Sequence, residues 1–599
     1  MRLKMEGPGL TELWRCKALL LAAFALCAAG MGSEAQTIMD LPARYWPAFP
    51  LPDRVVLGES HNGVNEAVRV VLNTVSGLVA HDTRCNHSGE MVWIGLTNSP
   101  SYDTWLAAYL ARTGVPCEKR VLSTWDLVDR YREQGIVKGY ILYRREPGDR
   151  PLYEGTPSDT SVNVATSLCA VWGGVAVEES IEADAKAHGL PLLLDARGKD
   201  EAWLFETYSG RLSRSVLGRQ DPKSGVNRDA IVALRAPVIG ETGPLYERML
   251  ERLRPGSPLL GWGIGLEDAQ TGPASEYASF QTATNWCANL PLLSSGETGL
   301  DYGFKPFTSP ADRNAAPDDT ARYVSFILSD GDNVQWLMLN FCKGEEAQQY
   351  WASPARGTIP FGWTICAMDL LQLCPYTLDY LRDTATPKDD FVLLGGGYYY
   401  PDWFGRKRPG ADWLAMQARR TAKYMNACGL NLLMVNVQQW DSPEATRAYE
   451  TYAREMPNLR GLFVIQYAPY TGGGGAIRWV NGLPVMAARN AIWAGRGEFP
   501  REGTPNRVAR LLNEWAAQPI KNEDDRFAWV IVHAWSWFQE AEFNAPLQTE
   551  ETDPKDMQPD PAARGYLPAV WAARHLSPNI RVVTPSALVE TLHLVHGKP

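Results

Sequence analysis

The C-terminal half of the chain alternates short apolar runs with helical stretches. Eight runs are predicted as strands: YVSFIL (323–328), FGWTIC (361–366), FVLLG (391–395), LNLLMVNV (430–437), LFVIQY (462–467), LPVMAARNAIW (483–493), FAWVIVHAW (527–535) and IRVVTP (580–585). Short runs rich in β-branched and aromatic residues are typical of buried strands. Eight strands with intervening helices is the (β/α)₈ count, so the sequence predicts a barrel.

One link departs from this pattern. TGGGGAIRWVNGLPVM, between the fifth and sixth runs, indicates a Gly-rich loop and a hairpin about Asn481 and Gly482. We therefore expect an irregular (β/α)8-like barrel, and a doubly wound sheet is the structural alternative.

The region from about 53 to 290 also alternates helix and strand, as doubly wound α/β sequence does. No G-x-G-x-x-G follows a strand, so a dinucleotide cofactor is unsupported. A stretch rich in Pro, Gly, Ser and Asp then precedes the barrel region. We predict small α/β units at 36–118, 119–235 and 236–300, a linker at 301–320 and the C-terminal domain at 321–599.

Residues 1–35 resemble a signal peptide, with basic residues before the apolar run ALLLAAFALCAAG and a small-x-small cleavage site at Ser33-Glu34-Ala35. This pattern predicts export to the periplasm or the extracellular space. A lipoprotein anchored through Cys27 is the alternative, but Leu26 is large where such signals require a small residue. No integral membrane segment is expected after signal removal.

Composition narrows the function classes. The net charge of −10 argues against a nucleic-acid partner, because such binding depends on clustered Lys and Arg. The ten cysteines are irregularly spaced without C-x-x-C, so neither a zinc site nor a disulfide framework is indicated. We predict no metal and no cofactor, and the oligomeric state stays open.

In a barrel, residues just after each strand line one mouth, where sites are built. The first predicted strand is followed by Asp330, Gly331, Asp332 and Asn333, and aspartates two apart in extended chain face the same way. Their carboxyls are candidates for acid/base work on a glycosidic bond. The alternative is purely structural, because Asp-Gly-Asp-Asn is also good turn and helix-capping sequence.

Carboxylates, amides and flat rings at the other strand ends suit a carbohydrate substrate. For the catalytic acids we propose Asp330 and Asp332, with Asp402 and Glu540 as further candidates. Tyr398, Tyr400 and Trp403 would form a sugar platform. The remaining candidates for substrate binding are Asn333, Gln438, Arg489, His533 and Trp535. His533 ends an apolar strand, where a core histidine is the alternative.

Residues 395–401, GGGYYYP, follow the third predicted strand. Tyr400 stands where G-x-G-x-x-G needs its third glycine, so this is no phosphate loop. The glycines would instead let the backbone turn or approach another segment closely. Tyr398 and Tyr400, two apart, should share a face, with Tyr399 pointing into packing.

The same residues match G-x-G-Y-x-Y-P at each position, and the chain resembles the bacterial GxGYxYP family, which is described as glycoside hydrolases. The resemblance covers about 320–590, including DGDN after the first strand. It implies a secreted protein of carbohydrate metabolism with a glycoside-hydrolase-like C-terminal domain.

Three functions follow from these residues. The first is an enzyme, a glycoside hydrolase that uses paired carboxylates. The second is a non-catalytic carbohydrate-binding or cell-surface protein on a glycosidase-like barrel. The third is a metal-dependent carbohydrate esterase or deacetylase, which would need more histidines than His533.

Overall fold

The computed structural model describes residues 40–97, 99–146, 148, 150–313, 317–496, 498–538 and 564–597. From Pro42 onward these form one compact unit. Four sheets organise it, and three of them lie in the first half of the chain. Among the residues described, no helix has both the length and the apolar character needed to cross a bilayer.

The first sheet has the order β2-β1-β3, all parallel. Its strands are β1 (Arg54–Ser60), β2 (Glu90–Gly95) and β3 (Cys117–Leu122), with helices α2 (Glu66–Asn86), α3 (Pro100–Thr113) and α4 (Thr124–Glu133). Helix α2 begins where the Asn65 side chain accepts the Val68 N–H at 3.0 Å. Its apolar face is buried.

The second sheet has the order β5-β4-β6, also parallel. It contains β4 (Gly139–Tyr143), β5 (Gly174–Glu178) and β6 (Leu192–Asp195), with α5 (Ser161–Trp172), α6 (Glu182–Ala187) and α7 (Glu201–Tyr208). Strands β4 and β5 are buried along their whole length. This is why they read as continuous apolar runs rather than as alternating ones.

The third sheet, β10-β9-β7-β8, lies closest in sequence to the C-terminal domain. Its elements are β7 (Leu217–Gln220), β8 (Val238–Ile239), β9 (Pro258–Trp262), β10 (Phe280–Thr282), α8 (Arg228–Leu234), α9 (Pro244–Arg252), α10 (Glu267–Glu276) and α11 (Leu290–Leu293). Its strands pair in parallel, as those of the first two sheets do. The predicted division at 118/119 falls within β3, and the one at 235/236 falls between β7 and β8 of this third sheet.

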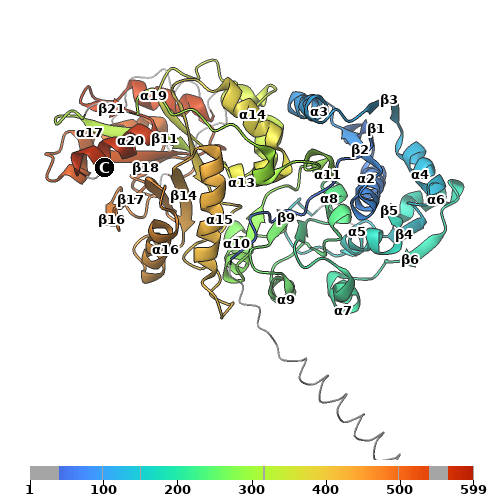
Figure 1. Ribbon diagram of the computed structural model, residues 1–599. Coiled ribbons are helices and arrows are strands. Elements are labelled where there is room, and N and C mark those ends of the chain that lie inside the picture. The colour runs from blue at the N-terminus through green and yellow to red at the C-terminus, as the bar shows by residue number, and fades with distance from the viewer. Residues whose placement is uncertain are drawn as a thin grey trace, which may run out of the picture. The chain divides into compact units, whose positions relative to one another are not determined.

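The fourth sheet holds all eight strands predicted for the C-terminal half. They are β11 (Arg322–Leu328), β12 (Phe361–Ile365), β13 (Asp389–Leu394), β14 (Leu432–Val437), β15 (Gly461–Gln466), β17 (Leu483–Ala487) continued as β18 (Asn490–Ile492), β20 (Phe527–Val532) and β21 (Ile580–Val582). Short strands β16 (Ile477–Val480) and β19 (Glu502–Gly503) extend it. Its helices are α12 (Val334–Trp336), α13 (Ala367–Leu373), α14 (Pro375–Thr384), α15 (Trp413–Cys428), α16 (Pro443–Glu455), α17 (Pro505–Ala516), α19 (Tyr566–Arg574) and α20 (Pro585–Val595). Figure 1 shows α15 and α16 side by side.

This sheet curls back on itself. Strand β17 pairs with β15, while β18, three residues further along the same stretch, pairs with β20. Strand β16 forms the predicted hairpin with β17 and is antiparallel to it. Met434, Phe463, Trp529 and Ile531 lie in its buried apolar core.

The curled sheet does not contain eight equal βα units. Strand β20 runs along one edge of β11, so β12 and β21 share the other edge. There β12 pairs with the end of β11 at Ile327 and Leu328, and β21 pairs only with its beginning. The eighth predicted strand is therefore a short insert, and the architecture is a barrel-like curled sheet preceded by three parallel sheets.

Candidate active site

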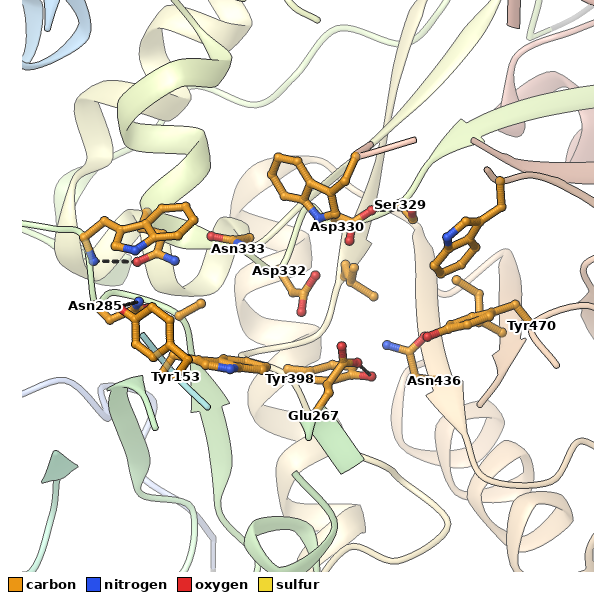
Figure 2. A pocket seen from close by; sticks show the side chains of 18 residues that line it. Tyr153, Glu267, Asn285, Ser329, Asp330, Asp332, Asn333, Tyr398, Asn436 and Tyr470 are labelled. Carbon is orange, nitrogen blue, oxygen red and sulfur yellow. Dashed lines mark hydrogen bonds between the residues drawn. The ribbon is translucent and has the colours of Figure 1, made fainter. Parts of the chain in front are cut away.

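A cavity of about 330 Å³ lies at the carboxyl ends of the curled sheet. Ser329 follows β11, and Leu394, Asn436 and Ile465 stand at or near the ends of β13, β14 and β15. Figure 2 shows the carboxyls of Asp330, Asp332 and Glu267 in the middle of this cavity. The position is the one that the strand-end argument predicts for a site.

The loop of residues 330–333 turns sharply over the end of β12. The Gly331 N–H donates to Thr364 Oγ1 at 3.0 Å, and a Cβ on Gly331 would lie 1.9 Å from the Thr364 carbonyl oxygen. Asp330 itself has a left-handed φ of 69°, which is unfavourable for a residue with a Cβ. This geometry lets both Asp330 and Asp332 face the cavity.

Asp330 is held by two donors. Its Oδ2 accepts the Ser329 hydroxyl, and it also accepts the Ala534 N–H at 3.2 Å. Ala534 follows β20, so the carboxyl is fixed from two neighbouring strands of the sheet. A side chain fixed in this way is preorganised for chemistry.

The third carboxyl, Glu267, comes from the N-terminal half of the chain. It is the first residue of α10, beyond β9 in the third sheet. The Tyr398 hydroxyl donates a hydrogen bond to its Oε1. Sequence reasoning missed Glu267 because strand ends were inspected only in the C-terminal domain; the same rule applied to β9 could have found it.

Burial and mutual repulsion keep protons in this cavity. Burial, with smaller contributions from the carboxyls of Asp330 and Glu267, raises the pKa of Asp332 to about 8. Burial also raises the pKa of Glu267 to about 7, although the hydrogen bond from Tyr398 opposes this shift. Close carboxyls cannot all ionise together, so the cavity holds protons at neutral pH.

The GGGYYYP segment joins the third sheet to the curled sheet. Tyr398 and Gln281 of β10 exchange backbone hydrogen bonds of 2.7 and 2.9 Å. A Cβ on Gly397 would lie 2.2 Å from the Phe280 ring, so only glycine permits this approach. Tyr398 points into the cavity, and the centroid of the Tyr400 ring lies 5.7 Å from that of the Tyr398 ring. The Tyr399 hydroxyl instead pairs with that of Tyr452 on α16.

Two further predicted residues, Asn333 and Trp535, line the cavity. His533 is not part of the lining but stacks on Trp493, which is, with ring centroids 3.7 Å apart. Burial lowers the pKa of His533 to about 4, so its ring is neutral at physiological pH.

Besides His533, five predicted residues lie outside the cavity lining. Asp402 accepts the backbone N–H of Gln438 at 2.9 Å, and burial raises the pKa of Asp402 to about 6. Trp403 packs on α10 beneath the Arg406 guanidinium, 4.1 Å from its centroid. Arg489 lies over the Trp515 ring, and Tyr400 is fully buried. Glu540 falls outside the described residues.

Several lining residues escaped prediction. They are Tyr153, Trp262, Ala283, Asn285 and Trp286 from the N-terminal half, and Asn436, Tyr470 and Trp493 from the curled sheet. Tyr470 follows the fifth predicted strand and Trp493 ends the sixth, so a fuller reading of those strand ends could have found them. Among the described residues that line the cavity none is Lys, Arg or His.

Taken together, the fold and the cavity define a class of protein: a multi-unit α/β protein with an acidic, aromatic-lined site at the strand ends of a curled sheet. Two family models match the chain. Residues 320–542 match the "GxGYxYP putative glycoside hydrolase C-terminal domain", and residues 137–212 match the "GxGYxYP_N second domain". Both are models of GxGYxYP family domains, which confirms the resemblance seen in the sequence.

A solved structure shares the fold. It is described as a putative hydrolase from Bacteroides thetaiotaomicron VPI-5482, with a TM-score of 0.73 and 24% sequence identity. The match covers 94% of this chain and 98% of the other. No curated protein matches the chain. The family name and the description of the solved structure both name a hydrolase.

Proposed function

We propose that this protein is a glycoside hydrolase that cleaves its substrate with paired carboxylates on an irregular barrel. The observation that carries the proposal is the convergence of Asp330, Asp332 and Glu267 in one cavity lined by rings and amides. Glycoside hydrolysis needs one protonated carboxyl and one carboxylate beside the glycosidic bond. The signal-like residues 1–35 support export of the enzyme to a compartment where glycans are found.

Asp332 is suited to act as the general acid. Its pKa of about 8 keeps the carboxyl protonated at neutral pH, so it can give a proton to the leaving oxygen. Asp330, which accepts two hydrogen bonds through one oxygen, would act as base or nucleophile. The bond from the anomeric carbon to the leaving oxygen breaks, and water supplies the new hydroxyl.

The test uses Asp332→Asn and nitrophenyl glycosides of several neutral sugars. The variant should lose about 10²- to 10⁴-fold in kcat/KM with p-nitrophenyl glycosides, because no proton reaches the leaving group. With 2,4-dinitrophenyl glycosides, whose leaving group needs little protonation, the loss should be much smaller. This difference between leaving groups is what identifies an acid.

Asp441→Asn is the matched control, since this exposed aspartate also follows a strand but lies outside the cavity lining. It should keep wild-type rates. Wild-type turnover by an Asp330→Asn, Asp332→Asn double variant would refute the proposal. Binding of saccharides without hydrolysis would favour the carbohydrate-binding alternative. Loss of activity on chelation would favour the metal-dependent esterase.

A further inference from the structure

We propose that the loop of residues 150–154 lines one side of a subsite for an uncharged sugar ring, and that Tyr153 is a specificity-determining residue of this subsite. The inference rests on the proposed function and adds to it the class of sugar and the part of the chain that selects it. The loop follows β4 and belongs to the second sheet, far in sequence from the carboxyls.

The cavity extends to both sides of the carboxyls. Figure 2 shows Tyr153 and Asn285 on one side of Asp332 and Glu267, and Asn436 and Tyr470 on the other. A glycosidic bond placed at the carboxyls would therefore put one sugar against each wall. Trp262 and Trp286, which also come from the N-terminal half of the chain, line the same cavity, and their flat faces suit pyranose rings.

Tyr153 is held in an unusual conformation. Its φ is 65°, a left-handed value that is rare for a residue with a Cβ. Its hydroxyl accepts the Asn285 side-chain N–H at 2.6 Å, and its carbonyl accepts the Gly265 N–H at 3.2 Å. Residues held in such conformations by their surroundings concentrate at binding sites.

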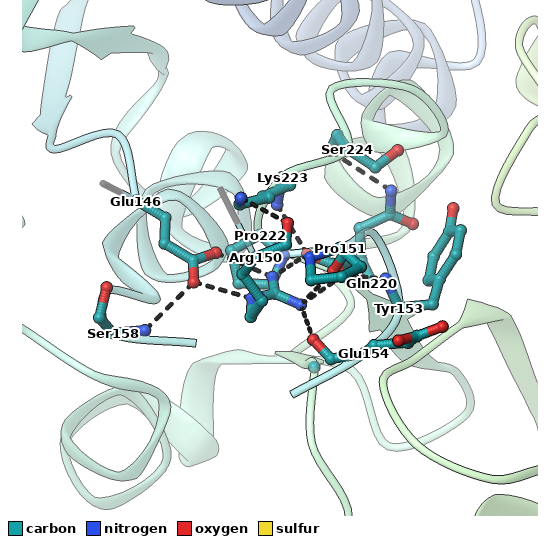
Figure 3. Close-up of polar contacts among 12 residues, drawn as sticks. Glu146, Arg150, Pro151, Tyr153, Glu154, Ser158, Gln220, Pro222, Lys223 and Ser224 are labelled. Atoms are coloured by element: carbon teal, nitrogen blue, oxygen red, sulfur yellow. Dashed lines mark hydrogen bonds and ion pairs between the residues drawn. The ribbon is translucent and has the colours of Figure 1, made fainter. Parts of the chain in front are cut away.

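Arg150 fixes the backbone that carries Tyr153. Its guanidinium lies 2.8 Å from Glu146 and 2.6 Å from Asp221, both of which are buried. The same Asp221 accepts the Tyr153 N–H at 2.6 Å, and Arg150 donates to the Glu154 carbonyl at 2.6 Å. Figure 3 shows Arg150 at the centre of this network, between Glu146 and Glu154. Arg150 is thus a positioning residue that acts through Tyr153.

The charges of the cavity define the class of sugar. Three carboxyls line it, and no Lys, Arg or His among the described residues does. A uronate or a sulfated ring would meet the carboxylate proposed at Asp330 with no cationic side chain in the described lining, and like charges brought together without compensation oppose binding. Rings, amides and hydroxyls remain to recognise a neutral sugar.

The experiment measures binding by titration calorimetry, in an Asp332→Asn background so that no turnover occurs. The probes are cellobiose, maltose, lactose and mannobiose, together with the counterpart of each binder in which one CH₂OH is a carboxylate. We expect at least one neutral disaccharide to bind and its uronate counterpart to bind at least about tenfold more weakly. Tyr153→Ala should weaken binding of the neutral disaccharide by about tenfold, and Tyr153→Phe, which keeps the ring, by no more than about threefold.

Arg150→Lys tests the positioning role without removing the buried positive charge. It should raise KM about threefold, because the planar guanidinium that orients the loop is lost. It should change kcat little, because the carboxyls of the cavity are unchanged. Arg144→Lys is the matched control: Arg144 pairs with Glu179 in the same sheet unit, and its side chain is 53% exposed. It should leave both constants unchanged.

The outcomes separate the two proposals. Unchanged binding by Tyr153→Ala, equal binding of the uronate counterparts, or no binding of any neutral disaccharide would each overturn the subsite. Tyr153-dependent binding by a wild-type protein that hydrolyses none of the glycosides would support the subsite and overturn the proposed hydrolase.

Discussion

At the scale of single residues, the proton on Asp332 is the feature on which the proposed chemistry depends. The carboxyl is only partly covered, yet it sits among protein groups and beside two other acids. Such an arrangement raises the pKa at a cost in stability, because the ionised form is disfavoured in the folded state. The same residue should therefore serve catalysis and limit stability at high pH.

This cost gives a pH-dependent prediction. The pKa of Asp332 rises from 3.8 to about 8 on folding, so between these values the folded protein holds a proton that the unfolded chain releases. Stability should fall as pH rises through this window. Asp332→Asn has no such proton. The Tm of the variant minus the Tm of the wild-type protein should therefore increase from pH 4 to pH 8. Thermal scans across that range measure the difference.

Asp441→Asn again provides the comparison, since its exposed side chain is outside the cavity lining. Its Tm should follow that of the wild-type protein at every pH. Parallel Tm curves for Asp332→Asn and wild type would show that the Asp332 carboxyl does not carry this linkage.

At the scale of elements, the family motif works as a junction as well as a source of cavity residues. Its glycines let the chain after β13 lie against β10. Ser275 of α10 accepts two N–H groups of this segment: its carbonyl oxygen accepts the Gly405 N–H at 2.8 Å, and its Oγ accepts the Tyr400 N–H at 2.9 Å. The motif thereby brings Tyr398 against Glu267. One short segment couples the third sheet to the site.

Gly397→Ala should disrupt this junction. Its Cβ would lie 2.2 Å from the Phe280 ring and 3.0 Å from the Gln281 carbonyl oxygen, in addition to the strain of φ 78°. Gly482→Ala, at φ 87° with nothing within 4 Å, carries the backbone strain of roughly 1 kcal/mol alone. We expect a clearly larger fall in Tm for Gly397→Ala than for Gly482→Ala. Equal falls would mean that the close approach at β10 contributes nothing.

At the scale of the whole molecule, the two halves of the chain are tied together at several buried points. Asp369 of α13 accepts hydrogen bonds from the Tyr45 hydroxyl at 3.0 Å and the Trp46 indole at 2.9 Å. Burial raises the pKa of Asp369 to about 6. These contacts make Asp369, which also follows a strand of the curled sheet, a structural acid that joins the start of the described chain to that sheet.

Asp369→Ala should therefore destabilise the protein. It would leave two buried donors unpaired, at roughly 1 to 3 kcal/mol for each. Asp369→Asn keeps an acceptor and should recover part of the loss in Tm. Asp383→Ala, where the side chain is 64% exposed, is the control and should change Tm little. A Tm for Asp369→Ala equal to that of the control would contradict the assigned role.

Much of the fold could be predicted because strand and helix periodicity is local. Each of the eight C-terminal runs contains a strand, and alternating strands and helices were expected upstream of them. The short insert β21 was not distinguished from a full strand, because its pairing is decided by how much of β11 the neighbouring β12 already occupies. The length of a predicted strand does not show how much of the neighbouring strand's edge is already paired.

The candidate site was predicted in part for the same reason. Asp330, Asp332, Asn333, Tyr398 and Trp535 were found from strand ends and line the cavity. Asp402, Gln438 and Arg489 also follow strands but do not line the cavity: the Asp402 carboxyl accepts the Gln438 backbone N–H, and the Arg489 guanidinium lies over the Trp515 ring. The position of a residue just after a strand predicts that it lies near the mouth of the barrel. Packing decides which of these side chains line the cavity.

The sequence by itself determined the alternation of strands and helices, the turn that carries two aspartates, and the motif that names the family. All of these are encoded within a few residues of one another. Only the tertiary structure decided that Glu267 and Tyr153 join those aspartates. That outcome depends on how separately encoded units pack together, and no local pattern of apolar or charged residues specifies which distant side chains will meet.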